Sequence, residues 1–430
     1  MRILHLFDQA MLNDCDYAMR SYAIVRQQRE MDFHTEQVII NSGEPHPEFQ
    51  DMDNSEVAVE CENEDANANS IAEARINFCG IDFQMLNLFG LFSNIPILSY
   101  CREFFQLRAH LRKLADQYNP QIIHAHSSAL VGLAAIQVGQ TRNIPVIYEL
   151  RSLWEDNNKN VANNHRLFRQ LQQKLETHVI RSASAVIALC DSLRYAAVAR
   201  GVAEEKIALV PNGGFPCVNP VTNTQAETIN NDLKQQLGLQ AKTLLGFVGT
   251  FKVQEGLRLL LQALPILLQG FPNLHLLLVG SGPEEDSLKQ LAAELGLSGQ
   301  ITFCGKLEHE KLTQYFDSID LLIYPRVSTP LTERVTPLIP LQAMAEGQVV
   351  LASDVGGHSA FIKHGDNGYL FKKEDKSALA DAVVDVLNER SSWSFVRERA
   401  KSFIKNERDW ASSVSNYKKL YSSLVMHEDA

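Results

Sequence analysis

The chain has 430 residues, which is too long for one compact core and indicates two domains. Its formal net charge of −11 argues against binding to nucleic acids and against broad binding to anionic membranes, because phosphate groups are attracted by positive fields. The seven cysteines include no CxxC pair and no apolar run reaches roughly 18 residues, so we expect a soluble cytoplasmic protein without a disulfide framework, a zinc site or a spanning helix.

Short β-rich apolar runs alternate along the chain with longer segments of helical period. Hydrophobicity within the runs is continuous, which indicates parallel strands that are covered by helices on both faces. In the first half these runs lie at residues 2–7, 36–40, 121–127, 144–150, 185–189 and 207–213. In the second half they lie at residues 244–251, 274–282, 301–305, 321–325 and 349–354.

The polar, breaker-rich stretch that follows residue 215 separates the two series of strands. We therefore predict an α/β protein with two doubly wound, Rossmann-like domains that face a cleft. The predicted domains cover residues 1–215 and 243–404, and a linker over 216–242 joins them.

An acidic segment at residues 44–65 carries nine carboxylates and no Lys or Arg. Like charges repel and few apolar residues anchor the segment, so we expect a solvated loop rather than a metal site. The Asp-x-Asp triplets at 14–16 and 51–53 do not end an apolar strand, and neither predicts a rigid metal site.

The segment from Met85 to Lys113 is apolar at first and then basic and amphipathic. It either dips into a membrane surface or forms a buried element followed by a solvated helix. We favour burial for residues 85–100 and leave both interpretations open for residues 102–113.

The stretch from Thr332 to Asp354 predicts a short helix. Thr336 suits the N-cap and Pro337 the first helical position, where a missing N–H costs nothing. Gly347 supplies the stop, which leaves a helix of about ten residues.

This helix begins at the carboxyl edge of a parallel sheet, which is where ligands bind in open α/β folds. Its N-terminus offers N–H donors and a partial positive charge that suit a phosphate, and Arg326 and Arg334 add full charges nearby. The alternative is an ordinary capped helix with surface arginines.

The wider pattern resembles the retaining glycosyltransferases of family 4, which have two Rossmann-like domains (the GT-B type). The matching phrases include "IIHAH", "PVIYELRSLWED", "IALVPNG", "GFVGTF", "LLLVGSGPEEDSLKQLAAELGL" and "TERVTPLIPLQAMAEGQVVLASDVGGHSAFIKHGDNGYLF". The resemblance covers most of the chain and is most specific from Leu244 to Phe371. The segments "YELRSLWED" and "TERVTPLIPLQAMA" resemble those of a branch of this family that is found in bacterial exopolysaccharide clusters.

The resemblance implies a division of labour between the domains. Residues 1–215 would bind the acceptor, and residues 243–404 would bind a nucleotide diphosphate sugar. Residues 405–430 would form a helix that crosses back to the first domain. The segment from Trp410 to Tyr421 resembles that helix.

The resemblance also implies roles for individual residues. His126, which ends its strand, would contact the donor sugar or phosphate, although a histidine within a strand is more often a satisfied core residue. Glu333 would position sugar hydroxyls, and Arg326 would stabilise the leaving diphosphate. Glu149 and Arg151 would face the acceptor, or else form a structural salt bridge. The expected donor side further includes Gly249, Thr250, Lys252, Arg334, Thr336, Pro337, Leu338 and Gln342.

Three departures from the family pattern concern the donor. The family has Gly-Arg and Lys-Gly pairs aimed at the diphosphate, where this chain has Gly249-Thr250 and Glu255-Gly256. Gln342 replaces the second of two paired glutamates. The loop after the first strand lacks the glycine that relatives have there. Lys252, Arg326 or Arg334 would have to replace the missing cations.

The expected function is the transfer of a sugar from a nucleotide diphosphate sugar to a glycan or lipid-linked acceptor in polysaccharide biosynthesis. We expect neither a metal nor another cofactor, and a cytoplasmic location with peripheral contact to the inner membrane face as an option. One alternative is a non-catalytic protein of the same fold that binds sugar nucleotides or acts as a scaffold. A third interpretation is a nucleotide-sugar epimerase.

Overall fold

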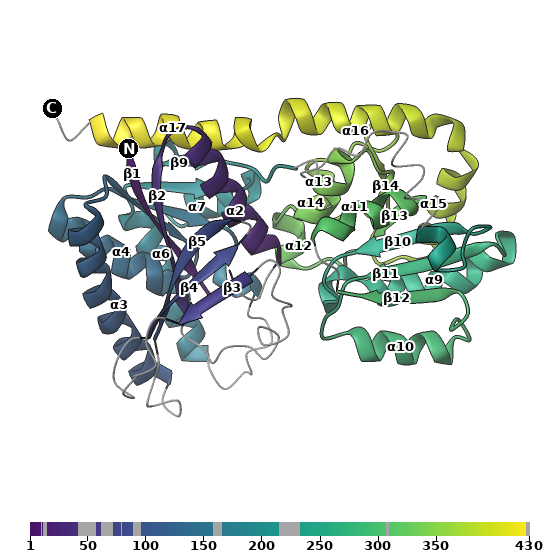
Figure 1. Ribbon diagram of the computed structural model, residues 1–430, viewed down its shortest axis with the longest axis horizontal. Coiled ribbons are helices and arrows are strands. Elements are labelled where there is room, and N and C mark those ends of the chain that lie inside the picture. Colours follow the sequence, from purple (N-terminus) through teal and green to yellow (C-terminus); the bar gives the residue numbers. More distant parts are fainter. Residues whose placement is uncertain are drawn as a thin grey trace. The chain divides into compact units, whose positions relative to one another are not determined.

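The computed structural model describes residues 1–9, 11, 15–41, 57–61, 72–78, 80–88, 96–157, 166–214, 233–306 and 309–426. The chain divides into two compact units, which are described one at a time (Figure 1). Unit 1 consists of Met1–Pro211 together with Trp410–Ala430, and unit 2 consists of Asn212–Asp409. Most of the predicted linker lies outside the described residues, and its part from Leu233 onward belongs to unit 2.

Unit 1 is built on a nine-stranded sheet with the order β3-β4-β5-β2-β1-β6-β7-β8-β9. Strand β4 is antiparallel to both of its neighbours, and the other neighbouring pairs are parallel. The strands are β1 (Arg2–Asp8), β2 (His34–Asn41), β3 (Val57–Cys61), β4 (Ala72–Phe78), β5 (Ile81–Asn87), β6 (Ile122–His126), β7 (Val146–Leu150), β8 (Ala185–Ala188) and β9 (Ile207–Leu209).

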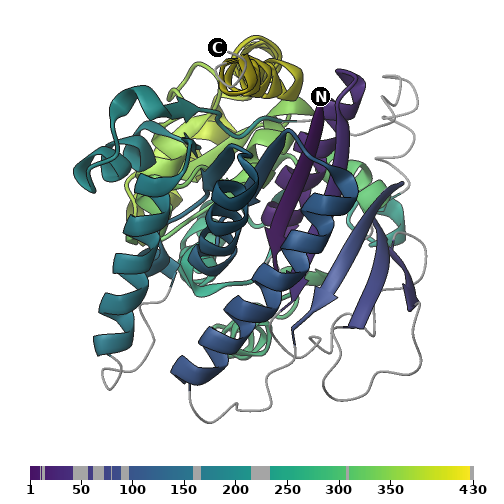
Figure 2. The ribbon, with the colours of Figure 1, turned by 90° about the vertical axis from the view of Figure 1, so that its left-hand side faces the viewer.

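The helices of unit 1 pack in two groups. Helix α3 packs on α4 and α4 on α6, whereas the C-terminal helix α17 packs on α2. Figure 2 shows α3 in blue and α6 in teal, with their N-terminal ends at the bottom. The helices are α2 (Cys15–Glu30), α3 (Pro96–Tyr118), α4 (Ala129–Arg142), α5 (Trp154–Asn157), α6 (Arg166–Ser182), α7 (Asp191–Ala199) and α17 (Trp410–Met426), with a 3-10 turn at Glu204–Lys206.

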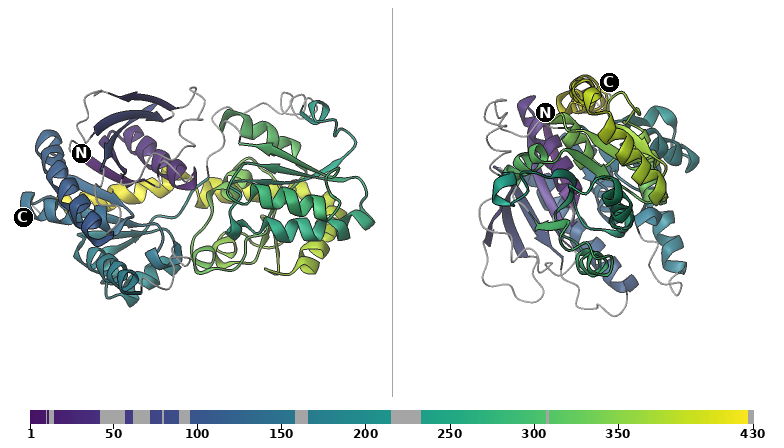
Figure 3. Two further views of the ribbon diagram at one scale, coloured as in Figure 1. Left: turned by 90° about the horizontal axis from the view of Figure 1, so that it is seen from below. Right: turned by 90° about the vertical axis from the view of Figure 1, so that its right-hand side faces the viewer.

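Unit 2 has a six-stranded, wholly parallel sheet with the order β12-β11-β10-β13-β14-β15. Helices lie on both sides of its strands (Figure 3). The strands are β10 (Thr243–Val248), β11 (Leu274–Val279), β12 (Ile301–Gly305), β13 (Leu321–Tyr324), β14 (Val350–Ser353) and β15 (Tyr369–Phe371). The helices are α9 (Leu257–Gly270), α10 (Glu285–Glu294), α11 (His309–Ser318), α12 (Pro330–Arg334), α13 (Leu338–Ala345), α14 (Gly356–Ser359), α15 (Lys376–Asn388) and α16 (Trp393–Glu407), with 3-10 turns at Val253–Glu255 and Arg390–Ser392.

The parallel strands predicted from continuous apolar runs are confirmed in both units, but the antiparallel edge of unit 1 was missed. Strand β3 lies inside the segment predicted as an acidic loop, so that prediction is wrong for Val57–Cys61. Strand β5 takes up Met85–Asn87, which the sequence analysis assigned to a longer apolar segment. The exposed Asp82 and the half-buried Gln84 interrupt the apolar residues of β5, so it lacks the continuous hydrophobicity that revealed the other strands. The rest of the acidic segment lies outside the described residues.

The predicted donor helix is shorter than expected and begins one position later. Helix α13 has eight residues, with Pro337 as its N-cap in an extended conformation and no side-chain cap. Thr336 is therefore not the N-cap, because Pro337 itself has an extended backbone, with φ −73° and ψ 150°, and the helix begins at Leu338. Helix α12 occupies Pro330–Arg334 just upstream. Gly347 has a φ of 77°, which agrees with the predicted stop after Ala345.

Candidate functional site

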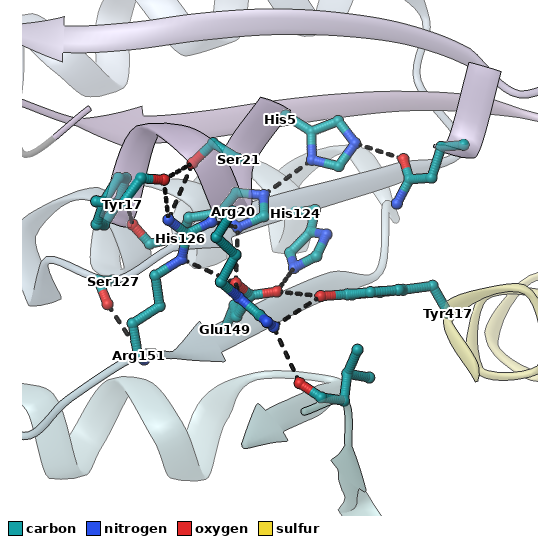
Figure 4. Close-up of polar contacts among 12 residues, drawn as sticks. His5, Tyr17, Arg20, Ser21, His124, His126, Ser127, Glu149, Arg151 and Tyr417 are labelled. Carbon is teal, nitrogen blue, oxygen red and sulfur yellow. Dashed lines mark hydrogen bonds and ion pairs between the residues drawn. The ribbon is translucent and has the colours of Figure 1, made fainter. Parts of the chain in front are cut away.

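A cluster of charged and aromatic polar side chains lies where three central strands of unit 1 end (Figure 4). His126 is the last residue of β6 and pairs in register with Glu149 of β7. His5 of β1 pairs in register with His124 of β6. All four side chains have no exposed surface. Because a buried charge must be paired to be tolerated, the partners of Glu149 decide what the cluster can do.

Glu149 is the centre of the cluster. Its Oε1 accepts hydrogen bonds from Arg20 Nε at 3.0 Å and from Arg151 Nε at 2.8 Å, and its Oε2 accepts one from Tyr417 of α17 at 2.5 Å. Burial alone would raise the pKa of Glu149, but Arg20 and Arg151 hold that pKa well below its ordinary value. The carboxylate is thus ionised and saturated with donors.

His126 was predicted to contact the donor sugar or phosphate, and in the structure its ring lies buried at the end of β6. Its Nδ1 lies 3.0 Å from Arg151 Nη2, and its Nε2 lies 2.9 Å from His5 Nδ1. Burial lowers the pKa of His126 to about 4, so the ring is neutral at pH 7. The predicted strand end is confirmed, and the side chain points toward His5 and Arg151. Its contact with a donor stays a prediction.

Glu149 and Arg151 were expected to face an acceptor or to form a structural pair, and the structure shows the pair. Arg151 is 6% exposed. Its Nη1 donates to the Tyr17 carbonyl at 3.1 Å and to Ser21 Oγ at 2.9 Å, in addition to its contacts with Glu149 and His126. Arg151 therefore anchors α2 to the ends of β6 and β7.

The sequence analysis found no group of metal ligands, whereas the structure brings together nitrogens of His5, His124 and His126 within 4.8 Å of one another. His5 was overlooked because its strand precedes the "HAH" motif by more than a hundred residues. The rings of His124 and His126 stack at 4.0 Å with an interplanar angle of 28°, so their in-plane lone pairs run side by side. The three rings are arranged for hydrogen bonding to one another and to their neighbours.

In unit 2, Arg326 follows β13 at the carboxyl edge of the sheet. Its Nε and Nη2 donate to the two oxygens of Glu255 at 2.9 and 2.8 Å. The turn that carries Glu255 lies directly against β13, because a Cβ on Gly256 would come within 1.9 Å of the Pro325 carbonyl. The Glu255 that departs from the family pattern is therefore the partner that orients Arg326.

Glu333, in α12, accepts hydrogen bonds from Ser328 Oγ at 2.5 Å, Lys373 Nζ at 2.5 Å and the Gly356 amide at 2.8 Å. Burial alone would raise the pKa of Glu333, but the hydrogen bonds from Lys373 and Ser328 bring it below its ordinary value. Lys373 was not foreseen. Its position directly after a short strand pattern, where Arg326 also stands, was the available signal.

The other predicted donor-side residues lie on the same half of unit 2. Gly249, after β10, has a φ of 152°, and a Cβ on Gly280 would come within 1.9 Å of its carbonyl. Thr250 follows it, and Lys252 lines a cavity of about 130 Å³ with Arg258, Glu284 and Val327. Arg334 ends α12, and the buried Thr336, Leu338 and Gln342 lie at or within the start of α13, with Asn212 Nδ2 donating to the Thr336 carbonyl.

Two family models match the chain. Residues 229–410 match glycosyl transferases group 1, and residues 89–213 match glycosyltransferase family 4. An uncharacterized glycosyltransferase of Methanocaldococcus jannaschii, MJ1607, is 28% identical over 208 residues, which are 48% of this chain and 51% of that protein. D-inositol 3-phosphate glycosyltransferase of Nocardia farcinica is 27% identical over 295 residues, 66% of this chain and 62% of that protein. The chain thus spans from half to under two thirds of these two relatives.

Among solved structures, Alr3699/HepE of Anabaena in complex with UDP aligns with a TM-score of 0.71 and 18% identity, over 98% of this chain and 100% of that one. This similarity shows that the fold is shared. No helix within the described ranges is long and apolar enough to cross a membrane. With each unit matched by a glycosyltransferase family model, the chain belongs to the family 4 type of glycosyltransferases and has their GT-B fold.

Proposed function

We propose that the chain is a retaining glycosyltransferase that moves a sugar from a nucleotide diphosphate sugar to a glycan or lipid-linked acceptor in polysaccharide biosynthesis. The carrying observation is a set of two ion pairs at the carboxyl edge of the sheet of unit 2, Arg326–Glu255 and Lys373–Glu333. Arg326 follows β13 and Lys373 follows β15, whereas Glu255 lies in the 3-10 turn after β10 and Glu333 lies in α12. The UDP complex of Alr3699/HepE, a protein of the same fold, supports the binding of a nucleotide.

The chemical task of the proposed site is to stabilise negative charge on the departing diphosphate. Preorganised donors typically contribute roughly 3 kcal/mol each in such a role. Arg326 is preorganised because Glu255 fixes its guanidinium through two parallel hydrogen bonds. Lys373 and the N-terminus of α13 add positive charge at the same edge, so no metal is required.

Glu333 remains the proposed partner of sugar hydroxyls. Its carboxylate offers about four acceptor positions, of which Ser328, Lys373 and Gly356 use three. Side-chain exposures of 32% for Glu333 and 35% for Lys373 leave both accessible to a ligand. A sugar hydroxyl that binds Glu333 would therefore share it with Lys373.

The test is to incubate the purified protein with a panel of nucleotide diphosphate sugars, with and without glycan and lipid-linked acceptors, and to follow release of the nucleotide diphosphate. Acceptor-dependent release supports transfer. Binding without release identifies the non-catalytic alternative, which the replaced cations and Gln342 favour. An altered sugar nucleotide without release identifies the epimerase. No binding to any donor would overturn the proposal.

Delivery of a lipid-linked acceptor further requires contact with a membrane, for which α3 is the proposed surface. Phe105 on this helix is 56% exposed, and Arg108 stacks over its ring at 5.3 Å. The helix carries four basic and two acidic residues in a chain of net charge −11. Exposed aromatic and basic side chains on one amphipathic helix favour anionic lipid surfaces.

Vesicle sedimentation tests this surface. The protein should bind vesicles that contain phosphatidylserine better than vesicles of phosphatidylcholine alone, and Phe105→Ser should weaken that binding several-fold. Phe395 of α16 is equally exposed at 56%, so Phe395→Ser is the matched control and should leave binding unchanged. Equal loss in both variants, or no preference for anionic lipid, would remove α3 from this role.

A further inference from the structure

Lys373 lies in the loop after β15, and the backbone of this loop is held on both sides of the lysine. The N–H of Lys373 donates to Asp354 Oδ1 at 2.8 Å, and the N–H of Asp354 donates to the Phe371 carbonyl at 2.8 Å. The next residue, Glu374, has a left-handed backbone with a φ of 60°, and its Oε1 accepts a hydrogen bond from the Ser328 N–H at 3.2 Å. A residue other than glycine keeps such a backbone only where its surroundings hold it. Lys373 therefore extends from a fixed support.

The carboxylate of Glu333, which pairs with Lys373, has one hydrogen-bonding position left. Each of its oxygens can accept about two hydrogen bonds. Oε1 accepts one from Ser328 Oγ and one from Lys373 Nζ, both at 2.5 Å, and is therefore full. Oε2 accepts one from the Gly356 N–H at 2.8 Å. Among the residues that the structure describes no second donor reaches Oε2, so this oxygen can accept a hydrogen bond from a ligand.

The ammonium group of Lys373 has donors beyond the one that Glu333 uses. An ammonium group carries three N–H donors, and one of them meets Glu333 Oε1. The hydrogen bond from Glu333 raises the pKa of Lys373, so the group is charged at pH 7. The side chain is 35% exposed. Within the described part of the chain, two N–H donors thus remain for a ligand next to the open position of Glu333.

An acceptor oxygen beside an ammonium group matches two neighbouring hydroxyls of a sugar. Each sugar hydroxyl can donate one hydrogen bond and accept others. The first hydroxyl can donate to Glu333 Oε2 while the oxygen of the second accepts from Lys373 Nζ. A phosphate fits less well, because its oxygens accept hydrogen bonds and would face the negative charge of Glu333.

The charges around Lys373 favour a neutral sugar over an acidic one. Glu333, Asp354 and Glu374 all lie close enough to raise the pKa of the ammonium group. Three carboxylates therefore surround one cation. The carboxylate of a uronic acid would add a fourth negative charge and would be repelled.

We propose that Lys373 is a specificity-determining residue of the donor site, which recognises, together with Glu333, two neighbouring hydroxyls of a neutral donor sugar. Glu333 accepts a hydrogen bond from the first hydroxyl, and Lys373 donates one to the oxygen of the second. This assignment rests on the proposed function, because it takes the sugar of the nucleotide diphosphate sugar to lie at this edge of the sheet.

Isothermal titration of the full chain tests the assignment. UDP-glucose, UDP-galactose, GDP-mannose and ADP-glucose are titrated to find a donor that binds, and the matching nucleotide diphosphate is the reference. Lys373→Met should weaken binding of the donor roughly tenfold, because a hydrogen bond from a charged group is lost, and should leave binding of the nucleotide diphosphate unchanged. Equal weakening for both ligands would place Lys373 at the diphosphate and overturn the proposal.

The neighbouring lysine provides the matched control. Lys372 is 75% exposed and pairs with Asp375 at 3.3 Å, so Lys372→Met removes the same charge from the same loop. It should leave the affinity for both ligands unchanged. Weakening of donor binding by Lys372→Met as large as that by Lys373→Met would reduce the effect to general charge and contradict the assigned contact. Thermal melts of both variants check folding.

Single deoxy analogues of the same donor locate the two hydroxyls. Removal of one hydroxyl should weaken binding to the wild type but not to Lys373→Met, because the contact is already lost there. Glu333→Gln should show the same coupling to an adjacent position, and UDP-glucuronate should bind more weakly than UDP-glucose. Coupling to no position or to positions that are not adjacent, or tighter binding of UDP-glucuronate, would overturn this proposal alone. Absence of binding to every donor would overturn the proposed function as well.

Discussion

Both units have charged residues at the ends of central strands, but these residues differ in solvent exposure and in the number of their partners. In unit 1, Glu149 has no exposed surface and Arg151 has 6%, and both are saturated by neighbours from α2 and α17. In unit 2, the side chains of Arg326 and Lys373 are 12% and 35% exposed and each is held by one carboxylate. We propose that the first arrangement fixes a scaffold and that the second presents oriented cations to a ligand.

This difference shows why the end of a strand is not by itself a functional assignment. A charged pair without solvent contact affects the free energy of unfolding mainly when one partner is removed. The other partner is then an uncompensated buried charge. A partly exposed pair can exchange its partner for a ligand phosphate at little cost. Substitutions should therefore damage stability in unit 1 and turnover in unit 2.

The largest effect is expected from Glu149→Ala, which leaves Arg20 and Arg151 buried without their carboxylate. Loss of one partner of a buried pair typically costs about 3–5 kcal/mol. Thermal and denaturant melts should show this loss. Glu30→Ala is the control, because the Arg26–Glu30 pair is exposed and such pairs contribute about 0.5 kcal/mol. Equal stability of the two variants would contradict the scaffold role.

Arg326→Ala should lower turnover by roughly 100-fold or more with a smaller change in donor affinity if, as proposed, Arg326 stabilises charge that develops in the transition state. Arg334→Ala should cost less and Lys252→Ala should fall between the two. Initial-rate kinetics with saturating donor measure the ranking, and thermal melts check folding. Turnover of Arg326→Ala within about threefold of wild type, a difference of roughly 0.7 kcal/mol, would leave Arg326 without a catalytic role.

Acid should destabilise the protein through the buried side chains of His5 and His126. The pKa of His5 falls from 6.5 when unfolded to about 3 in the fold, and that of His126 falls to about 4. The unfolded chain then binds more protons below pH 6.5, so stability is complete above about pH 7 and is lost as the pH falls toward 4. At pH 5 the loss should be at least about 2 kcal/mol, since each pKa unit corresponds to about 1.4 kcal/mol.

Denaturant melts between pH 7.5 and 5 measure this dependence. The double variant His5→Gln/His126→Gln should flatten it while lowering stability at pH 7.5. A wild-type profile that stays flat over this range would show that the histidines are charged in the folded state.

Chelation should have the smallest effect. Arg326, Lys373 and the N-terminus of α13 supply positive charge at the proposed diphosphate site, so EDTA should leave turnover unchanged. Loss of activity in EDTA, with recovery on addition of Mg²⁺ or Mn²⁺, would overturn metal-independent transfer.

The parallel architecture was predictable from sequence because strands buried on both faces read as continuous apolar runs. Strands β3 to β5 were not, because they form an antiparallel edge with polar residues on an exposed face, and β3 lies in an acidic segment. The start of α13 was misplaced by one residue because the pattern of two prolines fits more than one register. Local sequence thus identified the core strands better than the edges of the sheet.

The candidate site was predictable in position but not in side-chain direction. His126 and Glu149 stand at their predicted strand ends, yet nothing local shows that Arg20, Tyr417 and His5 enclose them. From the sequence, we interpreted Glu255 as the loss of a cation of the family. Only the structure shows that its carboxylate pairs with Arg326. Such pairings join residues far apart in the chain, which a single sequence does not reveal.

The contrast between the units is tested most directly by measuring turnover and apparent melting temperature side by side for Arg326→Ala and His126→Asn. Arg326→Ala leaves the buried Glu255 without its partner, so it should melt lower than wild type, and its turnover per folded molecule should fall roughly 100-fold. His126→Asn, which disturbs buried hydrogen bonds worth about 1–3 kcal/mol, should melt several degrees lower and keep most of its turnover per folded molecule. A His126→Asn protein as stable as wild type but nearly inactive would make His126 a ligand contact and contradict the account.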